Sequence, residues 1–209
     1  MDKERIKSNI SAEDDSNQRL GNMSLTEIGE RLFHWRDYSA IPAMLILLLV
    51  ARPTARTATI GTLLIVVGAV ARIYTVAFMG DSPKDNVGGD FLITTGPFAL
   101  IRNPLYLANM IITAGVIFYA GSLWLGTPLL LFFAFQYHCI TKYEESSLLA
   151  KFGDEYQRYR DRVPPWIPLK TPIADDFPVP PSLSSALVTE KRAIAFVATI
   201  LFLLMLAAH

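Results

Sequence analysis

Long apolar runs separated by charged connections limit the folds open to this chain. The runs cover residues 38–51, 57–79, 105–120, 122–140 and 193–208. A helix needs about 20 residues to cross a hydrocarbon core of about 30 Å, so the first and last runs are at the short limit. Backbone polar groups in lipid need partners within their own segment, which favours helices. We therefore expect an all-α integral membrane protein with about five transmembrane helices.

The chain divides by composition into four regions that together suit one domain. They are a cytoplasmic N-terminal tail with a possible interfacial helix (1–37), a transmembrane core (38–170), a proline-rich linker (171–192) and a C-terminal transmembrane helix (193–209).

Local signals predict the start of one helix and one tight turn between helices. Ser24 can cap a helix, with Glu27 three residues later completing a capping box. That helix either lies in the membrane interface or packs beneath the bundle, and residues 1–22 before it have a disordered composition. The segment Tyr119–Ser122 leaves room only for a tight turn, so the third and fourth apolar runs form an antiparallel hairpin.

Basic residues predict the orientation in the membrane. Of the 19 Lys and Arg residues, 16 lie before the first run, between the second and third runs, or after the fourth. Two lie between the first and second runs, and Arg72 lies inside the second. Because basic connections stay in the cytoplasm, we expect a cytoplasmic N-terminus, a C-terminus on the opposite side, and both long polar connections on the cytoplasmic side.

Other features argue against several function classes. The formal net charge of zero gives no reason to expect nucleic-acid binding. The histidines at positions 34, 138 and 209 show no metal-ligand spacing, so no metal is expected.

Arg72 lies seven residues before Met79, about 10 Å along a helix, and we expect its side chain to snorkel to the membrane surface.

The stretch from Tyr143 to Pro168 is the strongest candidate site. If Glu145 begins a helix, residues 148, 149 and 152 share its face and make that face apolar. A carboxylate on such a face is costly unless it is paired. Glu144 points about 100° away and can stay in water.

The preceding cytoplasmic connection, residues 80–104, offers a brief extended piece at 91–94 and ends with Pro104, which suits a first helical turn.

Two motifs carry a family resemblance. TTGPFALIRNPLY (Thr94–Tyr106) contains G-P-F-x3-R-N-P-x-Y, and EESSLLAKFGDEYQRYRDRVPPWIP (Glu144–Pro168) follows after a helical hairpin. In this order and spacing, the motifs resemble the membrane-embedded S-adenosylmethionine-dependent methyltransferases of the isoprenylcysteine carboxyl methyltransferase and phospholipid methyltransferase group. The commonest form of that family has His where this chain has Asn103. Asparagine cannot take up a proton near neutrality, so we assign Asn103 to hydrogen bonding only.

The resemblance implies S-adenosylmethionine as cofactor, a cytoplasmic cofactor-binding region, a lipophilic acceptor and the following roles. Arg102 would bind a carboxylate. Glu145 would accept hydrogen bonds from ribose or ammonium groups, with Glu144 as the second choice for this role. His138 would be the base or orienting group. Gly96 would allow close backbone approach. The catalytic candidates are Arg102, His138 and Glu145; the cofactor-binding candidates are Gly96, Pro97, Arg102, Asn103, Pro104, Tyr106, Glu144, Glu145, Tyr156 and Tyr159.

Alternative readings stay open for the residues and for the whole chain. Arg102 can mark the membrane surface, the tyrosines can be interfacial residues, and His138 can be a satisfied buried histidine. The chain could also be an NADPH-dependent membrane sterol or steroid reductase, or a small non-enzymatic membrane protein. As acceptor, a prenylated cysteine carboxylate, a phosphatidylethanolamine amine, a thiol or a smaller lipophile would all suit a methyltransferase.

Overall fold

The computed structural model describes residues 24–79, 91–168 and 182–207, and these residues are helical or irregular. The elements are α2 (Leu25–Leu49), α3 (Ala55–Met79), the short 3-10 helix η1 (Gly96–Ala99), α4 (Pro104–Ala120), α5 (Leu123–Phe152), α6 (Asp154–Arg162) and α7 (Leu183–Ala207). No strand occurs within the described ranges, so the expected all-α class is confirmed there. The expected extended piece at residues 91–94 is accordingly not part of a sheet.

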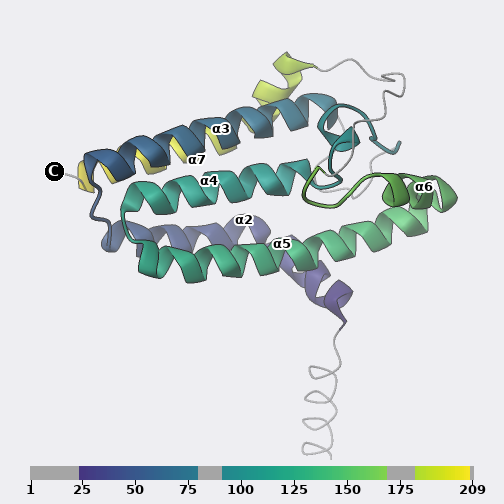
Figure 1. Ribbon diagram of the computed structural model, residues 1–209, viewed down its shortest axis with the longest axis horizontal. Coiled ribbons are helices and arrows are strands. Elements are labelled where there is room, and N and C mark those ends of the chain that lie inside the picture. Colours follow the sequence, from purple (N-terminus) through teal and green to yellow (C-terminus); the bar gives the residue numbers. More distant parts are fainter. Residues whose placement is uncertain (1–23, 80–90, 169–181, 208–209) are drawn as a thin grey trace, which may run out of the picture.

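The long helices lie side by side in an elongated bundle (Figure 1). Helix α3 packs against α4, α2 packs against α5, and α7 lies along α3. At one end of the bundle, α6 and η1 gather beside the start of α4 and the end of α5 (Figure 1). The two sequence motifs therefore meet at this end, although a helical hairpin separates them in the chain.

Glycines allow α3 and α4 to approach closely. A Cβ on Gly61 would lie 2.6 Å from the carbonyl oxygen of Gly115, and one on Gly115 would lie 2.8 Å from the backbone nitrogen of Ile65. Small residues at a helix contact are the usual device for close packing in lipid. Gly121 caps the C-terminus of α4 with φ +69°, so the expected tight turn between α4 and α5 is present.

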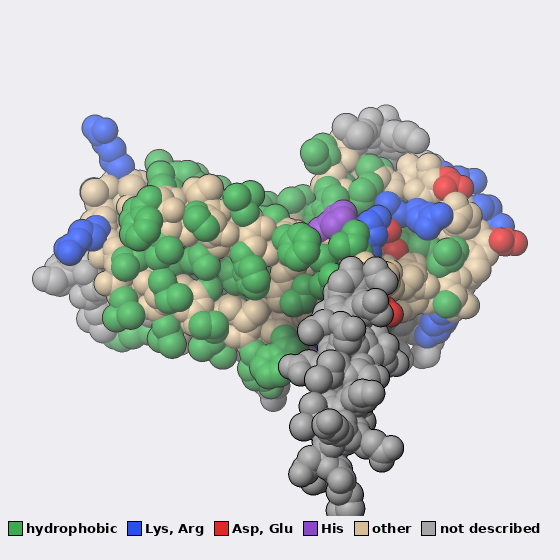
Figure 2. All heavy atoms as spheres, turned by 90° about the horizontal axis from the view of Figure 1, so that it is seen from below, with side chains coloured by type: hydrophobic (Ala, Val, Ile, Leu, Met, Phe, Trp, Pro, Cys, Tyr) green, Lys and Arg blue, Asp and Glu red, His purple; other side chains and the backbone are tan. Residues whose placement is uncertain are grey.

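Two helices, α3 and α5, are long and apolar enough to cross a membrane by length and composition. Shorter apolar stretches occupy Tyr38–Leu47 in α2, Pro104–Ala120 and Ala193–Leu203 in α7. Figure 2 shows apolar side chains over the middle of one face, most charged side chains gathered at the α6 end, and Lys or Arg side chains also at the opposite end. This banded surface is typical of a protein that sits in a bilayer.

Helix bounds differ from the expected regions in three places. Ser24 and Glu27 form the capping box, with backbone-to-side-chain distances of 2.9 and 3.3 Å, but the helix continues unbroken through residue 37 into the first apolar run. Helix α5 likewise passes the end of its apolar run at residue 140, because nothing before Gly153 interrupts it. The expected linker 171–192 ends early, since α7 begins at Leu183. Residues 171–181 of that linker and residues 1–22 lie outside the described residues.

The prediction that Arg72 snorkels is wrong. Its Nε donates to Glu190 Oε2 at 2.6 Å, its Nη2 donates to Glu190 Oε1 at 3.4 Å, and its Nη1 donates to Asn109 Oδ1. The Glu190 side chain is only 1% exposed. A carboxylate that sequence composition places in a linker is therefore the buried partner of Arg72, and it joins α7 to α3.

Candidate active site at the α4–α5 end of the bundle

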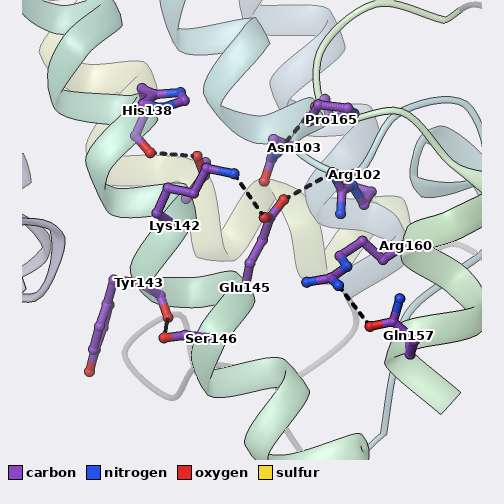
Figure 3. A network of polar contacts seen from close by, with 11 residues as sticks. Arg102, Asn103, His138, Lys142, Tyr143, Glu145, Ser146, Gln157, Arg160 and Pro165 are labelled. Atoms are coloured by element: carbon purple, nitrogen blue, oxygen red, sulfur yellow. Dashed lines mark hydrogen bonds and ion pairs between the residues drawn. The ribbon is translucent and has the colours of Figure 1, made fainter. Parts of the chain in front are cut away.

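Arg102 and Glu145 form the centre of the polar cluster (Figure 3). Arg102 lies in the connection just before α4, and its Nη2 is 3.2 Å from Oε1 of Glu145 on α5. The other carboxylate oxygen lies 3.6 Å from Nζ of Lys142, one turn earlier on the same helix. Both side chains of the Arg102–Glu145 pair are 10% exposed. The carboxylate on the apolar face of α5 is thus paired, as its burial requires.

The Arg102 guanidinium has unused hydrogen-bonding capacity. Its Nε and Nη1 are buried and have no hydrogen-bond partner within the described part of the chain. A buried donor without a partner costs about 1–3 kcal/mol. Guanidinium forks match carboxylate and phosphate groups in a bidentate manner. The open donors of Arg102 therefore fit an anionic group held beside Glu145.

Three hydrogen bonds join the first motif to α6 and the segment that follows it. The backbone N–H of Arg102 donates to the carbonyl of Pro164 at 2.9 Å, and Nδ2 of Asn103 donates to the carbonyl of Pro165 at 3.1 Å. The Tyr159 hydroxyl donates to the Phe98 carbonyl at 2.8 Å. These bonds hold the Arg102 connection against the segment after α6, and they give Asn103 a hydrogen-bonding role that needs no proton uptake.

Tyr156 and Tyr159 are buried on the inner face of α6. Burial raises the pKa of Tyr156 to about 12, and the negative charge of Glu145 acts in the same direction. Burial also raises the pKa of Tyr159 above its usual range. Both hydroxyls are therefore neutral donors near neutral pH. The Tyr159 hydroxyl donates its hydrogen bond to the Phe98 carbonyl, whereas Tyr156 lies close enough to the Arg102–Glu145 pair to interact with it electrostatically.

Glu144 belongs to a second polar cluster and is not the water-exposed group expected from its position. Its Oε1 accepts a hydrogen bond from the Tyr106 hydroxyl at 2.7 Å. Nη1 of Arg36, on α2, lies 3.8 Å from the same oxygen. The Glu144 side chain is 22% exposed. Neighbouring carboxylates on α5 thus have different cationic partners, Arg102 for one and Arg36 for the other.

The glycine and prolines of the first motif have packing roles. Gly96 has φ +60°, and a Cβ there would lie 2.5 Å from the Phe78 ring of α3. The residue is therefore glycine because of its backbone conformation and this contact. Pro97 is buried in η1, and Pro104 begins α4, as expected for a first helical turn.

A comparison with family models identifies the central part of the chain. Residues 57–155 match the model of the family described as phospholipid methyltransferase. This segment is similar to the phospholipid methyltransferase family, and we call residues 57–155 the phospholipid methyltransferase segment. The phospholipid methyltransferase segment contains all but the first two residues of α3, the whole of η1, α4 and α5, and with them Arg102 and both carboxylates of the candidate site. Helices α2 and α7 lie outside it. The description of this family agrees with the motifs in the sequence.

Two curated proteins are similar to part of the chain. The nickel-cobalt-cadmium resistance protein NccN of Alcaligenes xylosoxydans xylosoxydans is 28% identical over 55% of this chain and 51% of its own length. The cobalt-zinc-cadmium resistance protein CzcN of Cupriavidus metallidurans is 30% identical over 53% of this chain and 48% of its own length. The chain spans about half the length of these relatives. No solved structure matches the chain.

His138 stands apart from the other candidates of the phospholipid methyltransferase segment. Its side chain is exposed, and its backbone carbonyl accepts from Thr141 at 2.9 Å. In Figure 3 its ring points away from Glu145, and no contact joins the two side chains. Within the described residues no group of three or more His, Cys, Asp or Glu side chains is placed to hold a metal ion. Arg36 and Lys142 are the site neighbours that motif matching did not identify, because both lie outside the motifs.

Proposed function

We propose that this chain transfers a methyl group from S-adenosylmethionine to a lipophilic acceptor at the membrane. The observation that carries the proposal is the Arg102–Glu145 pair, which joins the two motifs and leaves two buried guanidinium nitrogens open to an anion. The phospholipid methyltransferase family supports the reaction class. The alternatives, a nicotinamide-dependent reductase or a non-enzymatic membrane protein, have no comparable support.

The residues present fit the chemical groups of this cofactor. The open donors of Arg102 suit its carboxylate, in a bidentate pair. Glu144, Glu145 and the neutral Tyr156 hydroxyl offer partners for its ammonium and ribose hydroxyls. When bound, the sulfonium supplies an activated methyl group, and transfer of that group leaves a neutral thioether. The protein's part is then to align the reactants and to exclude water.

We further propose that α2, α3, α4, α5 and α7 all cross the bilayer, with a cytoplasmic N-terminus. Helix α4 has 17 residues and a length of about 25 Å, short of a core of about 30 Å. Its partners α3 and α5 are longer, and a bilayer thins locally around a short span at modest cost. The distribution of Lys and Arg supports the orientation. An acceptor would enter sideways from the lipid, while the cofactor would enter from the cytoplasm.

Calorimetric titration of the purified, detergent-solubilised chain tests the cofactor assignment. S-adenosylhomocysteine and NADPH are titrated in parallel. We expect S-adenosylhomocysteine to bind and NADPH not to bind. Arg102→Ala and Glu145→Gln should each lower the affinity for S-adenosylhomocysteine clearly. Arg158→Gln, which changes an exposed arginine on α6, should leave that affinity unchanged. Binding of NADPH alone would favour the reductase, and silence from both ligands in folded protein would favour a non-enzymatic role.

A labelling experiment addresses the acceptor. The chain is incubated with S-adenosylmethionine labelled in the methyl group and with each acceptor class separately: phosphatidylethanolamine vesicles, a prenylated cysteine and a long-chain thiol. We expect label to enter one of these classes and to be lost in Glu145→Gln. Label in none of them, with S-adenosylhomocysteine bound normally, would exclude these three acceptors while leaving the cofactor assignment intact.

A further inference from the structure

We propose that α2 completes the cofactor site and that Arg36 is a positioning residue for Glu144. This inference rests on the proposed function and extends it to a helix outside the phospholipid methyltransferase segment. It also changes the relative weight of the two carboxylates, because Glu144 becomes the one that presents an open oxygen to the cofactor.

The contacts of the two carboxylates differ. Both oxygens of Glu145 face cations, Arg102 on one side and Lys142 on the other. The contacts of Glu144 from Tyr106 and Arg36 both fall on Oε1, and its Oε2 has no partner within the described residues. A carboxylate oxygen without a partner is ready to accept from a hydroxyl or an ammonium group. Glu144 therefore has the free acceptor that the cofactor requires.

Arg36 and Tyr106 fix the direction of that oxygen. Nη1 of Arg36 donates to the Tyr106 hydroxyl at 3.5 Å, and the hydroxyl donates in turn to Glu144 Oε1 at 2.7 Å. The guanidinium lies 4.2 Å above the centre of the Phe33 ring, one turn earlier on α2. Stacking on an aromatic face restricts a guanidinium group, so the three-residue chain from Arg36 to Glu144 is held in one arrangement.

The packing of α2 on α5 keeps Arg36 at this position. A Cβ on Gly29 would lie 2.1 Å from the carbonyl oxygen of Cys139, so the close contact there requires glycine. Beyond Arg36, the side chains of Ser39 and Gln136 hydrogen-bond to each other at 3.0 to 3.1 Å. Gln136 is 1% exposed. Close contacts on both sides of Arg36 thus determine how near its side chain comes to Glu144.

A double-mutant cycle on S-adenosylhomocysteine affinity tests whether Arg36 acts through Glu144. The titrated proteins are the unmodified chain, Arg36→Gln, Glu144→Gln and the double variant, each checked for thermal unfolding. We expect each single change to weaken binding about tenfold and the double change to weaken it no further, because the two residues act as one unit. Arg36→Lys restores the charge and should recover most of the loss. Arg31→Gln changes an exposed arginine on the same helix and should bind normally.

The outcomes separate this inference from the proposed function. If the unmodified chain fails to bind S-adenosylhomocysteine, the proposed function is overturned and the inference with it. Normal binding by Arg36→Gln overturns the inference alone. So does a double variant whose loss is the product of the two single losses, because Arg36 would then act independently. A loss that Arg36→Lys does not reduce, accompanied by a lower unfolding temperature, would make Arg36 a structural residue and likewise overturn the proposal.

Discussion

Arg72 of α3 and Glu190 of α7 are 118 residues apart and form a two-point ion pair. Arg72 lies inside the phospholipid methyltransferase segment, and Glu190 lies outside it. Asn109 of α4 accepts a third hydrogen bond from the same guanidinium. One half-buried arginine thus connects three helices, and it attaches the C-terminal helix to the phospholipid methyltransferase segment.

Breaking the pair should destabilise the protein. Glu190→Ala leaves the half-buried Arg72 charge without its carboxylate, and loss of one partner from a fully buried pair costs about 3–5 kcal/mol, which sets the upper value here. Chemical unfolding in detergent measures this loss, and Lys191→Ala, at the exposed neighbouring position, is the control. Replacing both partners by methionine should recover much of the loss. Equal stability of Glu190→Ala and Lys191→Ala would show that the pair contributes nothing.

The bond from Tyr159 to Phe98 should support both stability and cofactor binding. Tyr159→Phe keeps the ring but leaves the Phe98 carbonyl without its donor, at a cost of about 1–3 kcal/mol. Because this bond holds the Arg102 connection, we also expect faster hydrogen exchange over residues 98–102 and weaker S-adenosylhomocysteine binding. Tyr143→Phe removes a hydroxyl that has no partner within the described residues, so it should match the parent protein. Unchanged exchange in Tyr159→Phe would contradict the prediction.

Stability should fall at alkaline pH partly through Tyr156. Burial raises its pKa to about 12, above the ordinary value of 10.0. The folded state therefore keeps a proton that the unfolded state releases between these values. The contribution to the free energy of unfolding is fully present below pH 10 and is lost as the pH rises toward 12. Unfolding curves at about pH 9, 10 and 11 should show a shallower decline for Tyr156→Phe; an identical decline in both proteins would reject the assignment.

His138→Ala should leave cofactor affinity unchanged, since the exposed ring makes no contact with Glu145. Its effect on methyl transfer is a separate matter. Loss of a general base would lower the rate of methyl transfer by about 100-fold or more; because His138 lies apart from the Arg102–Glu145 pair, we expect a normal rate. Methyl transfer at the normal rate would remove His138 from the catalytic residues.

Features determined by neighbours in the sequence could be predicted well. The Ser24–Glu27 capping box, the turn at Gly121 and the start of α4 at Pro104 all depend on residues within a few positions of each other. The two motifs also indicated the residues that meet at the α4–α5 end, because their order and spacing match a known family. The pairing of Glu145 followed from its place on an apolar helix face.

Contacts between distant helices could not be predicted in the same way. Snorkelling was a reasonable expectation for Arg72 because nothing in its own run suggests a partner, and the partner lies on a helix whose charged first turns look like a linker. Glu144 appeared exposed for a related reason: its direction on α5 is predictable, but the approach of Arg36 from α2 is not. Such pairings depend on how helices pack, which single-sequence periodicity does not report.

The length of α5 sets the depth at which an acceptor would react. Glu144 follows the first residue of this helix by 21 positions, about 32 Å along the axis. With α5 crossing as proposed, its two carboxylates lie level with the lipid headgroups, beyond a core of about 30 Å. Methylation would then act on the polar end of a lipid while the acyl chains remain in the bilayer. Turnover should accordingly depend on how far the reactive group projects from the surface, and little on acyl chain length.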